Sequence, residues 1–388
     1  MTKYNFTSAP NRLKNHSVKW QATETDPEVL PMWIADMDFE TFPEMSQAVK
    51  KFADYGVYGY GYPPKSLYDA IISWEKEEHQ YEIKQEDIIL ISGVVPAITV
   101  AIQAFTKPGD AVLINTPLYP PFARTIKLNN RQLVTNSLVE VNGRFEIDFE
   151  QLEKDIVEND VKLYAFCSPH NPGGRVWDKT ELIKIAELCK QYDVRLISDE
   201  IHQDLTLFDN QHHSFNTVGD YASFAIVLSS ATKTFNIAGT GTAFVLIEDE
   251  LLKKKFKTQQ LANNQHEVTT LGLLATETAL TYGKPWLVEL KKVLVENLSY
   301  LVTYFEEHAP RVKVMQPEGT YLIWVDFSDY GLSDDILYGL FRDEAKVILN
   351  NGTSFGVEGK GHVRVNIAAP LEHVKQAVQR IVAVLPKD

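Results

Sequence analysis

Lys233 stands in a run rich in hydroxyl side chains, Ser229-Ser-Ala-Thr-Lys-Thr, directly after the apolar run 224–228. An amine in such a place can attack a carbonyl carbon when burial or a neighbouring cation lowers its pKa. A lysine in a loop of this kind is more often simply solvated. Lys233 therefore becomes a catalytic candidate only if other reactive or binding groups gather around it.

Asp199 is a carboxylate that follows a second apolar run, in the stretch Leu196-Ile-Ser-Asp-Glu-Ile-His202. Burying a carboxylate is costly unless a cation accompanies it. A protonated pyridine nitrogen is such a cation, and an aspartate that holds it keeps the ring electron-poor. Asp199 could equally cap the next helix, and Glu200 could be a core or surface residue.

Two further segments could orient a planar ligand. Asn171 lies in Cys167-Ser-Pro-His-Asn-Pro-Gly-Gly, where proline and glycine fix a turn that can hold the amide toward a ligand oxygen. Tyr119 lies in Thr116-Pro-Leu-Tyr-Pro-Pro and could stack on a planar heterocycle. The alternatives are an ordinary turn for Asn171 and core packing for Tyr119.

A segment of small residues, Ser92-Gly93-Val94-Val95, precedes a helical pattern. The free backbone N–H groups at the start of a helix can bind a phosphate. A glycine before a helix is common, so the segment carries little weight alone. The combination of amine, carboxylate, amide, stacking ring and phosphate site is specific where each segment by itself is not.

The candidate residues follow short apolar runs that alternate with helical patterns between about residues 45 and 285. The runs are 87–92, 111–115, 162–167, 194–198, 224–228 and 241–247. This alternation predicts an α/β fold with a largely parallel sheet that helices cover on both faces. Ligands of such sheets bind outside the carboxyl ends of the strands, where these candidates stand.

The flanking segments predict additional structure. Residues 1–44 are polar and interrupted by proline, and we interpret them as an arm and part of a small domain. Residues 45–287 then form the large domain. Residues 288–388 mix helical and strand patterns, which predicts a smaller α+β domain at the C-terminus.

Composition excludes several classes of function. The formal net charge is -14, which disfavours nucleic-acid binding. Only Cys167 and Cys189 are present, too few for a disulfide framework. We see no signal peptide, membrane span or convincing metal-ligand spacing among the ten histidines, so we expect a cytoplasmic protein without a metal.

The chain resembles the fold type I pyridoxal 5'-phosphate (PLP) enzymes of the class I and II aminotransferase superfamily. The resemblance spans nearly the whole sequence. It is strongest for the cystathionine β-lyase-like C–S lyases of the MalY/PatB type, which share the stretches ADMDF, VYGYGY, CSPHNPGG, SDEIHQDL and TKTFNIAG. It implies the PLP-dependent transferase fold, with a mostly parallel seven-stranded sheet in the large domain.

The resemblance also implies roles for the residues around the cofactor. Lys233 would form the Schiff base, Asp199 would pair with the pyridine nitrogen, and Asn171 would bond the phenolic oxygen. His202 would stand where many aminotransferases have a tyrosine. Tyr119 would stack on the ring and take part in catalysis with Lys233 and Asp199.

The remaining roles concern phosphate and substrate. The phosphate would be held by Gly93, Val94, Val95, Ser230 and Thr232, and Tyr60 would reach it from a second subunit, which implies a homodimer. The substrate would contact Arg364, Asn171, Ala35 and Tyr60, with the guanidinium of Arg364 forked onto the α-carboxylate. One departure is Gly241, where many aminotransferases have an arginine on the phosphate.

Two reactions fit these parts, because one fold can host both. A β-lyase would cleave L-cystathionine, L-cysteine or related S-substituted cysteines to pyruvate, ammonia and a thiol, and the density of the resemblance around the site favours it. An aminotransferase is the alternative enzyme. A regulator acting by protein contact is the alternative from another class, although intact Lys233, Asp199 and Arg364 indicate retained catalysis.

Overall fold

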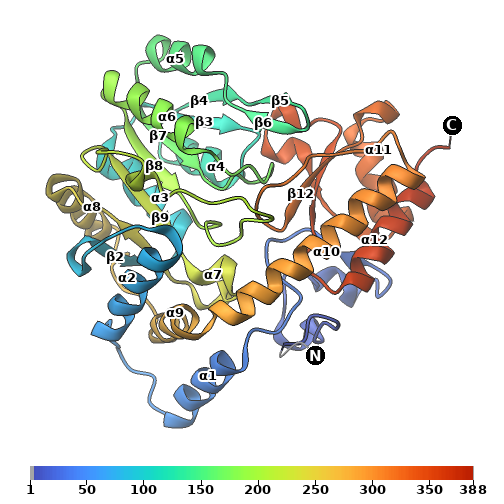
Figure 1. Ribbon diagram of the computed structural model, residues 1–388, viewed down its shortest axis with the longest axis horizontal. Coiled ribbons are helices and arrows are strands. Elements are labelled where there is room, and N and C mark those ends of the chain that lie inside the picture. Colours follow the sequence, from blue (N-terminus) through green and yellow to red (C-terminus); the bar gives the residue numbers. More distant parts are fainter. Residues whose placement is uncertain (1–3, 388) are drawn as a thin grey trace.

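A seven-stranded sheet forms the core of one half of the molecule in the computed structural model, which describes residues 4–387 (Figure 1). Its strands are β2 (Ile88–Ile91), β3 (Ala111–Thr116), β4 (Gln132–Ser137), β7 (Val161–Cys167), β8 (Arg195–Asp199), β9 (Ala225–Ser229) and β10 (Ala243–Leu246). Their order across the sheet is β2-β10-β9-β8-β7-β3-β4. Only β10 runs against its neighbours, so the predicted mostly parallel sheet of this fold is confirmed.

Both faces of this sheet are covered by helices because its strands are apolar on both sides. Successive residues of a strand point to opposite faces, and in β3 Leu113 and Ile114 accordingly belong to different core clusters. One face packs against α3 (Val94–Phe105), α4 (Pro121–Leu128) and α8 (Glu250–Ala262). The other face packs against α2 (Lys65–His79), α5 (Phe149–Glu158), α6 (Lys179–Gln191) and α9 (Thr270–Tyr282).

A second, antiparallel sheet is built from the C-terminal part of the chain. Its strands, in order, are β11 (Lys313–Val314), β12 (Leu322–Asp326), β15 (His362–Asn366) and β14 (Asn350–Asn351). The long helix α10 (Lys284–His308) lies beside α12 (Leu371–Val384) in this half of the molecule (Figure 1). The N-terminal segment joins the same half, because β1 (Leu30–Pro31) pairs with β13 (Val347–Ile348).

Two further α-helices, a hairpin and the one-turn helix α7 complete the structure described. They are α1 (Pro43–Tyr55), the hairpin β5 (Val139–Val141) and β6 (Arg144–Glu146), α7 (Ala231–Thr234) and α11 (Asp334–Gly339). No helix within residues 4–387 is long and apolar enough to cross a membrane. The domain limits at residues 44 and 287 stay a prediction; the first of them falls inside α1 and the second inside α10.

Candidate active site

Lys233 lies in the short helix α7, directly after β9. The side chain of Ser230 caps this helix by accepting a hydrogen bond from Thr232 N at 3.1 Å. The Lys233 amine donates to the carbonyl oxygen of Ala35 at 2.7 Å. Burial, helped by nearby Arg364, lowers the pKa of Lys233 to about 8, so a neutral amine is accessible near physiological pH.

Asp199 ends β8, the strand next to β9, and its side chain is buried. One carboxylate oxygen accepts from Ile201 N at 3.1 Å. No lysine, arginine or histidine of residues 4–387 forms an ion pair with it. Burial raises the pKa of Asp199 to about 7, which indicates a site that a cationic ring nitrogen would stabilise.

Arg364 on β15 and Asn171 after β7 meet across the two halves of the protein. The Arg364 guanidinium donates to Asn171 Oδ1 at 2.9 Å, to Asn350 Oδ1 at 2.6 Å and to Trp33 O at 3.2 Å. Arg364 is buried, and its Nε atom has no partner in the described part of the chain. These acceptors are all neutral, so the guanidinium is suited to receive the carboxylate of a ligand.

His202 and Tyr321 lie at the same site. Burial, with Lys233 and Arg364 nearby, lowers the pKa of His202 to about 3, so its imidazole is neutral. Its ring lies edge-on to Tyr321, with centroids 6.2 Å apart. The Tyr321 hydroxyl donates to Ala35 O at 3.1 Å, the carbonyl that also accepts from Lys233. The sequence interpretation missed Tyr321, because it begins a strand pattern and carries no motif of its own.

The predicted phosphate residues lie at one edge of the large sheet. Gly93 precedes α3, which begins at Val94, and Ser230 follows β9. The intervening strand β10 pairs with both β2 and β9, which places these two segments on either side of its start. Ser230 and Thr232 are buried, and their hydroxyl oxygens lie 2.8 Å apart.

Gly241 has a backbone conformation that disfavours an arginine at this position. Its φ of +62° is in the left-handed region, which side chains with a Cβ rarely adopt. A Cβ here would lie 3.5 Å from Ser92 O, beside the predicted phosphate segment. Glycine in place of the arginine of many aminotransferases thus suits this position, because a short helical turn ends here in the left-handed conformation.

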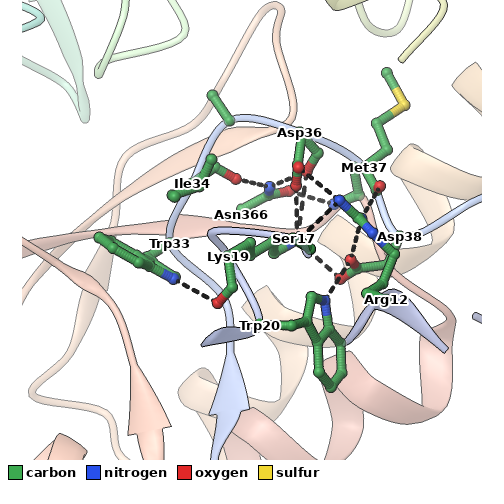
Figure 2. A network of polar contacts seen from close by, with 12 residues as sticks. Arg12, Ser17, Lys19, Trp20, Trp33, Ile34, Asp36, Met37, Asp38 and Asn366 are labelled. Carbon is green, nitrogen blue, oxygen red and sulfur yellow. Dashed lines mark hydrogen bonds and ion pairs between the residues drawn. The ribbon is translucent and has the colours of Figure 1, made fainter. Parts of the chain in front are cut away.

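A network of charges in the N-terminal arm fixes the segment around Ala35 (Figure 2). Arg12 contacts Asp36 at 2.7 Å and Asp38 at 2.8 Å. The buried amine of Lys19 also contacts Asp38 at 2.8 Å, and Trp20 Nε1 donates to the same carboxylate at 2.8 Å. Two cations of the arm, Arg12 and Lys19, therefore hold the ADMDF stretch in place.

Asn366 holds the carbonyl groups of the two residues that flank Ala35 (Figure 2). Its amide donates to Ile34 O at 2.6 Å and to Asp36 O at 2.7 Å. Because Asn366 is on the same strand as Arg364, the arm, the carboxylate site and the lysine are fixed together. Asn366 was also missed, since its role depends on a contact between segments more than three hundred residues apart.

Two of the predicted site residues, Tyr60 and Tyr119, lie outside or at the border of the cluster around Lys233. Tyr60 is fully exposed, in the segment between α1 and α2, and does not reach Lys233 of its own chain. Tyr119 is half-buried after β3. Burial lowers the pKa of Arg364 to about 10, and the nearby Tyr119 opposes part of this shift. A cleft of about 1250 Å³ between the arm, α1 and the loop after Lys233 leads to the amine.

The fold and the arrangement of Lys233 and Asp199 at adjacent strand ends define a PLP-dependent transferase fold of type I. Residues 27–381 match the family of class I and II aminotransferases, and the chain belongs to this family. It is 38% identical to cystathionine β-lyase PatB of Bacillus subtilis, over 98% of this chain and 100% of that protein.

Solved structures show the same likeness. A PLP-bound C–S lyase from Staphylococcus hominis superimposes with a TM-score of 0.93 at 32% identity, covering 100% of this chain and 99% of that one. A PLP-bound putative aminotransferase from Clostridium difficile 630 gives a TM-score of 0.95 at 38% identity, covering 99% and 100%.

Proposed function

We propose that the protein is a PLP-dependent C–S β-lyase. It would convert L-cystathionine, L-cysteine and related S-substituted cysteines to pyruvate, ammonia and a thiol. The observation that carries this proposal is the full-length similarity to PatB, a cystathionine β-lyase, in a chain that brings Asp199 and Arg364 close to Lys233.

The residues present fit the cofactor. Asp199 is a buried carboxyl group without a cationic partner in residues 4–387, which a protonated pyridine nitrogen would supply. Lys233 offers an amine of lowered pKa for the aldehyde. Gly93, Ser230 and Thr232 would hold the phosphate through backbone N–H and hydroxyl groups. When bound, the cofactor supplies an electron sink for the bonds at the substrate Cα.

The chain's own residues would then bind the substrate and move its protons. Arg364 and Asn171 hold the α-carboxylate and so fix which Cα bond faces Lys233. The Lys233 amine removes the Cα proton, and the Cβ–S bond breaks with both electrons leaving on sulfur. The thiolate takes up a proton and departs, and the released 2-aminoacrylate hydrolyses to pyruvate and ammonia.

An aminotransferase is the second candidate, favoured by the similarity to the C. difficile protein. The two functions differ in their need for a 2-oxo acid, which only a transaminase requires for turnover. We would incubate the PLP-loaded protein with L-cysteine, L-cystathionine and an S-alkyl cysteine, without any 2-oxo acid, and measure free thiol or sulfide. A lyase releases it from the start; an aminotransferase releases none.

Replacing Arg364 with lysine should raise KM for the amino-acid substrate about 10- to 100-fold, because a point charge replaces a planar fork. We expect kcat to change much less, since the carboxylate is held equally in the ground and transition states. Steady-state kinetics with L-cystathionine measure both values. An unchanged KM would place the substrate carboxylate elsewhere.

We further propose that the working unit is a homodimer whose sites lie at the subunit interface. The segment between α1 and α2 supports this, because it exposes Val57, Tyr58, Tyr60 and Tyr62 to solvent. Such a cluster of exposed apolar side chains is typical of an interface.

We propose that the enzyme works in the cytoplasm, where its two free, buried cysteines would stay reduced.

Mixing two inactive variants tests the shared site. If Tyr60 serves the neighbouring subunit, a hybrid of a Lys233→Ala chain and a Tyr60→Ala chain contains one intact site. Random exchange should restore roughly a quarter of the original activity, as two-fold symmetry requires. Lyase activity before and after co-refolding measures this. A Tyr60→Ala chain that is active alone would mean that Tyr60 has no part in the site, and no recovery despite hybrid formation would mean that Tyr60 acts within its own chain.

A further inference from the structure

A buried polar cluster contacts Thr234, the residue that follows Lys233. It joins α2, the turn that follows Asp199, and α7. Its centre is Asp204, whose side chain is buried. None of the roles proposed above for cofactor or substrate uses this carboxylate.

Asp204 accepts hydrogen bonds from three side chains. Trp74 Nε1 and His79 Nε2, both on α2, lie 3.0 Å and 2.7 Å from Oδ1. The Thr234 hydroxyl donates to Oδ2 at 2.6 Å. Thr234 directly follows Lys233, so this carboxylate links the lysine-bearing helix to α2.

Helix α2 also contacts Phe235, the residue that follows Thr234 at the end of α7. The rings of Trp74 and Phe235 lie edge-to-face, with centroids 5.6 Å apart. At its other end α7 is held by Ser230, whose hydroxyl donates to Thr242 O at 2.6 Å. Because α7 is only four residues long, its own backbone hydrogen bonds are too few to fix the direction of Lys233.

Charged groups around Asp204 keep it ionised. Despite burial, its hydrogen bond to His79 lowers the pKa of Asp204, and the pKa of His79 rises to about 9. The other groups facing this pair are Glu75 on α2, Glu200 before the turn, His212 and, across a cavity of about 120 Å³, Lys291 on α10. A buried ionised acceptor makes a strong bond to a hydroxyl group.

We propose that Asp204 is a positioning residue for Lys233, acting through the hydroxyl group of Thr234. The bond holds the last turn of α7 against α2 and so keeps the amine directed at the reacting carbon. This inference rests on the proposed function, because it assigns Asp204 and Thr234 to the same site.

Thr234→Val removes the hydroxyl group with little change in volume, and Thr234→Ser keeps the hydroxyl group while removing a methyl group. We expect Thr234→Val to lower kcat for thiol release about 10- to 100-fold, since small errors in orientation are costly, with KM nearly unchanged. Thr234→Ser should recover most of kcat. Thr234→Ala, which leaves room for water beside Asp204, should lose activity as Thr234→Val does.

A second measurement reports on the site without turnover. The visible circular dichroism of the PLP-loaded protein depends on how the chain holds the cofactor, and should change in Thr234→Val but not in Thr234→Ser. Thr106→Val is the matched control. Thr106 is also a buried threonine bonded to a charged side chain, Arg131 at 2.9 Å, but stands at the far end of α3. It should leave both readings unchanged.

The outcomes separate this inference from the proposed function. If the unmodified protein releases no thiol, the lyase proposal fails, yet the dichroism series still tests the role of Thr234. If the unmodified protein is active while Thr234→Val matches it in kcat and dichroism, the inference is wrong. A loss of thermal stability alone, without those changes, would make the bond purely structural and would also overturn the inference.

Discussion

Lys233→Ala should lower the rate of thiol release from L-cystathionine by about 10⁴-fold or more. The variant loses both the group that attaches the cofactor and the amine that takes the Cα proton, and removing a catalytic group of this kind has effects of that size. Activity assays measure the loss of turnover. Borohydride reduction followed by mass spectrometry of the peptide containing residue 233 measures the loss of cofactor attachment.

A matched control is Lys253→Ala. Lys253 is also a buried lysine, but it lies on α8, away from the cleft, and its amine forms an ion pair with Asp87 at 3.0 Å. This variant should keep the cofactor attached and remain active. Cofactor that is still reduced onto the chain in Lys233→Ala would show that another amine holds it, and the assignment of Lys233 would be wrong.

Asp199→Asn should lower kcat about 10³-fold while the protein stays folded. The amide can still accept the hydrogen bond from Ile201 N, made at 3.1 Å in the native protein. It cannot stabilise a positive charge on the pyridine nitrogen, so the electron sink weakens in the transition state. Steady-state kinetics under PLP saturation measure kcat, and a value equal to that of the native enzyme would contradict the assignment.

Stability gives this variant an independent signature. Burial raises the pKa of Asp199 to about 7, so the folded, cofactor-free protein binds this proton more tightly than the unfolded chain. The native protein therefore loses stability through this group as pH rises from about 4 to about 7. Asp199→Asn lacks that loss, and its Tm without cofactor at pH 8 should equal or exceed that of the native chain. A lower Tm would mean that the ionised carboxylate is stabilised within the protein.

Much of the large sheet could be predicted because its strands are apolar on both faces. The runs around Ile89, Leu113, Ala165, Ile197, Leu228 and Val245 all became strands. Strand β4 gave no such run, since as an edge strand it alternates buried and exposed residues. The reversed direction of β10 could not be read either, because hydrophobicity does not encode strand direction.

The candidate site was predicted where chemistry stands at a strand end. Lys233, Asp199 and Asn171 follow apolar runs, and parallel strands bring those ends together. Tyr321 and Asn366 were missed because they act through the arm around Ala35, which is distant in sequence. Asp204 was also missed, since its partners lie on two elements, α2 and α7, that are separate from it in sequence.

The most direct test of the account is the product ratio from L-cystathionine. The PLP-loaded protein, without any 2-oxo acid, should release pyruvate, ammonia and free thiol in equal amounts, and all three should vanish in Lys233→Ala. Absence of pyruvate and thiol until a 2-oxo acid is added, with the amino group then found on that acid, would contradict the β-lyase proposal and make the protein an aminotransferase.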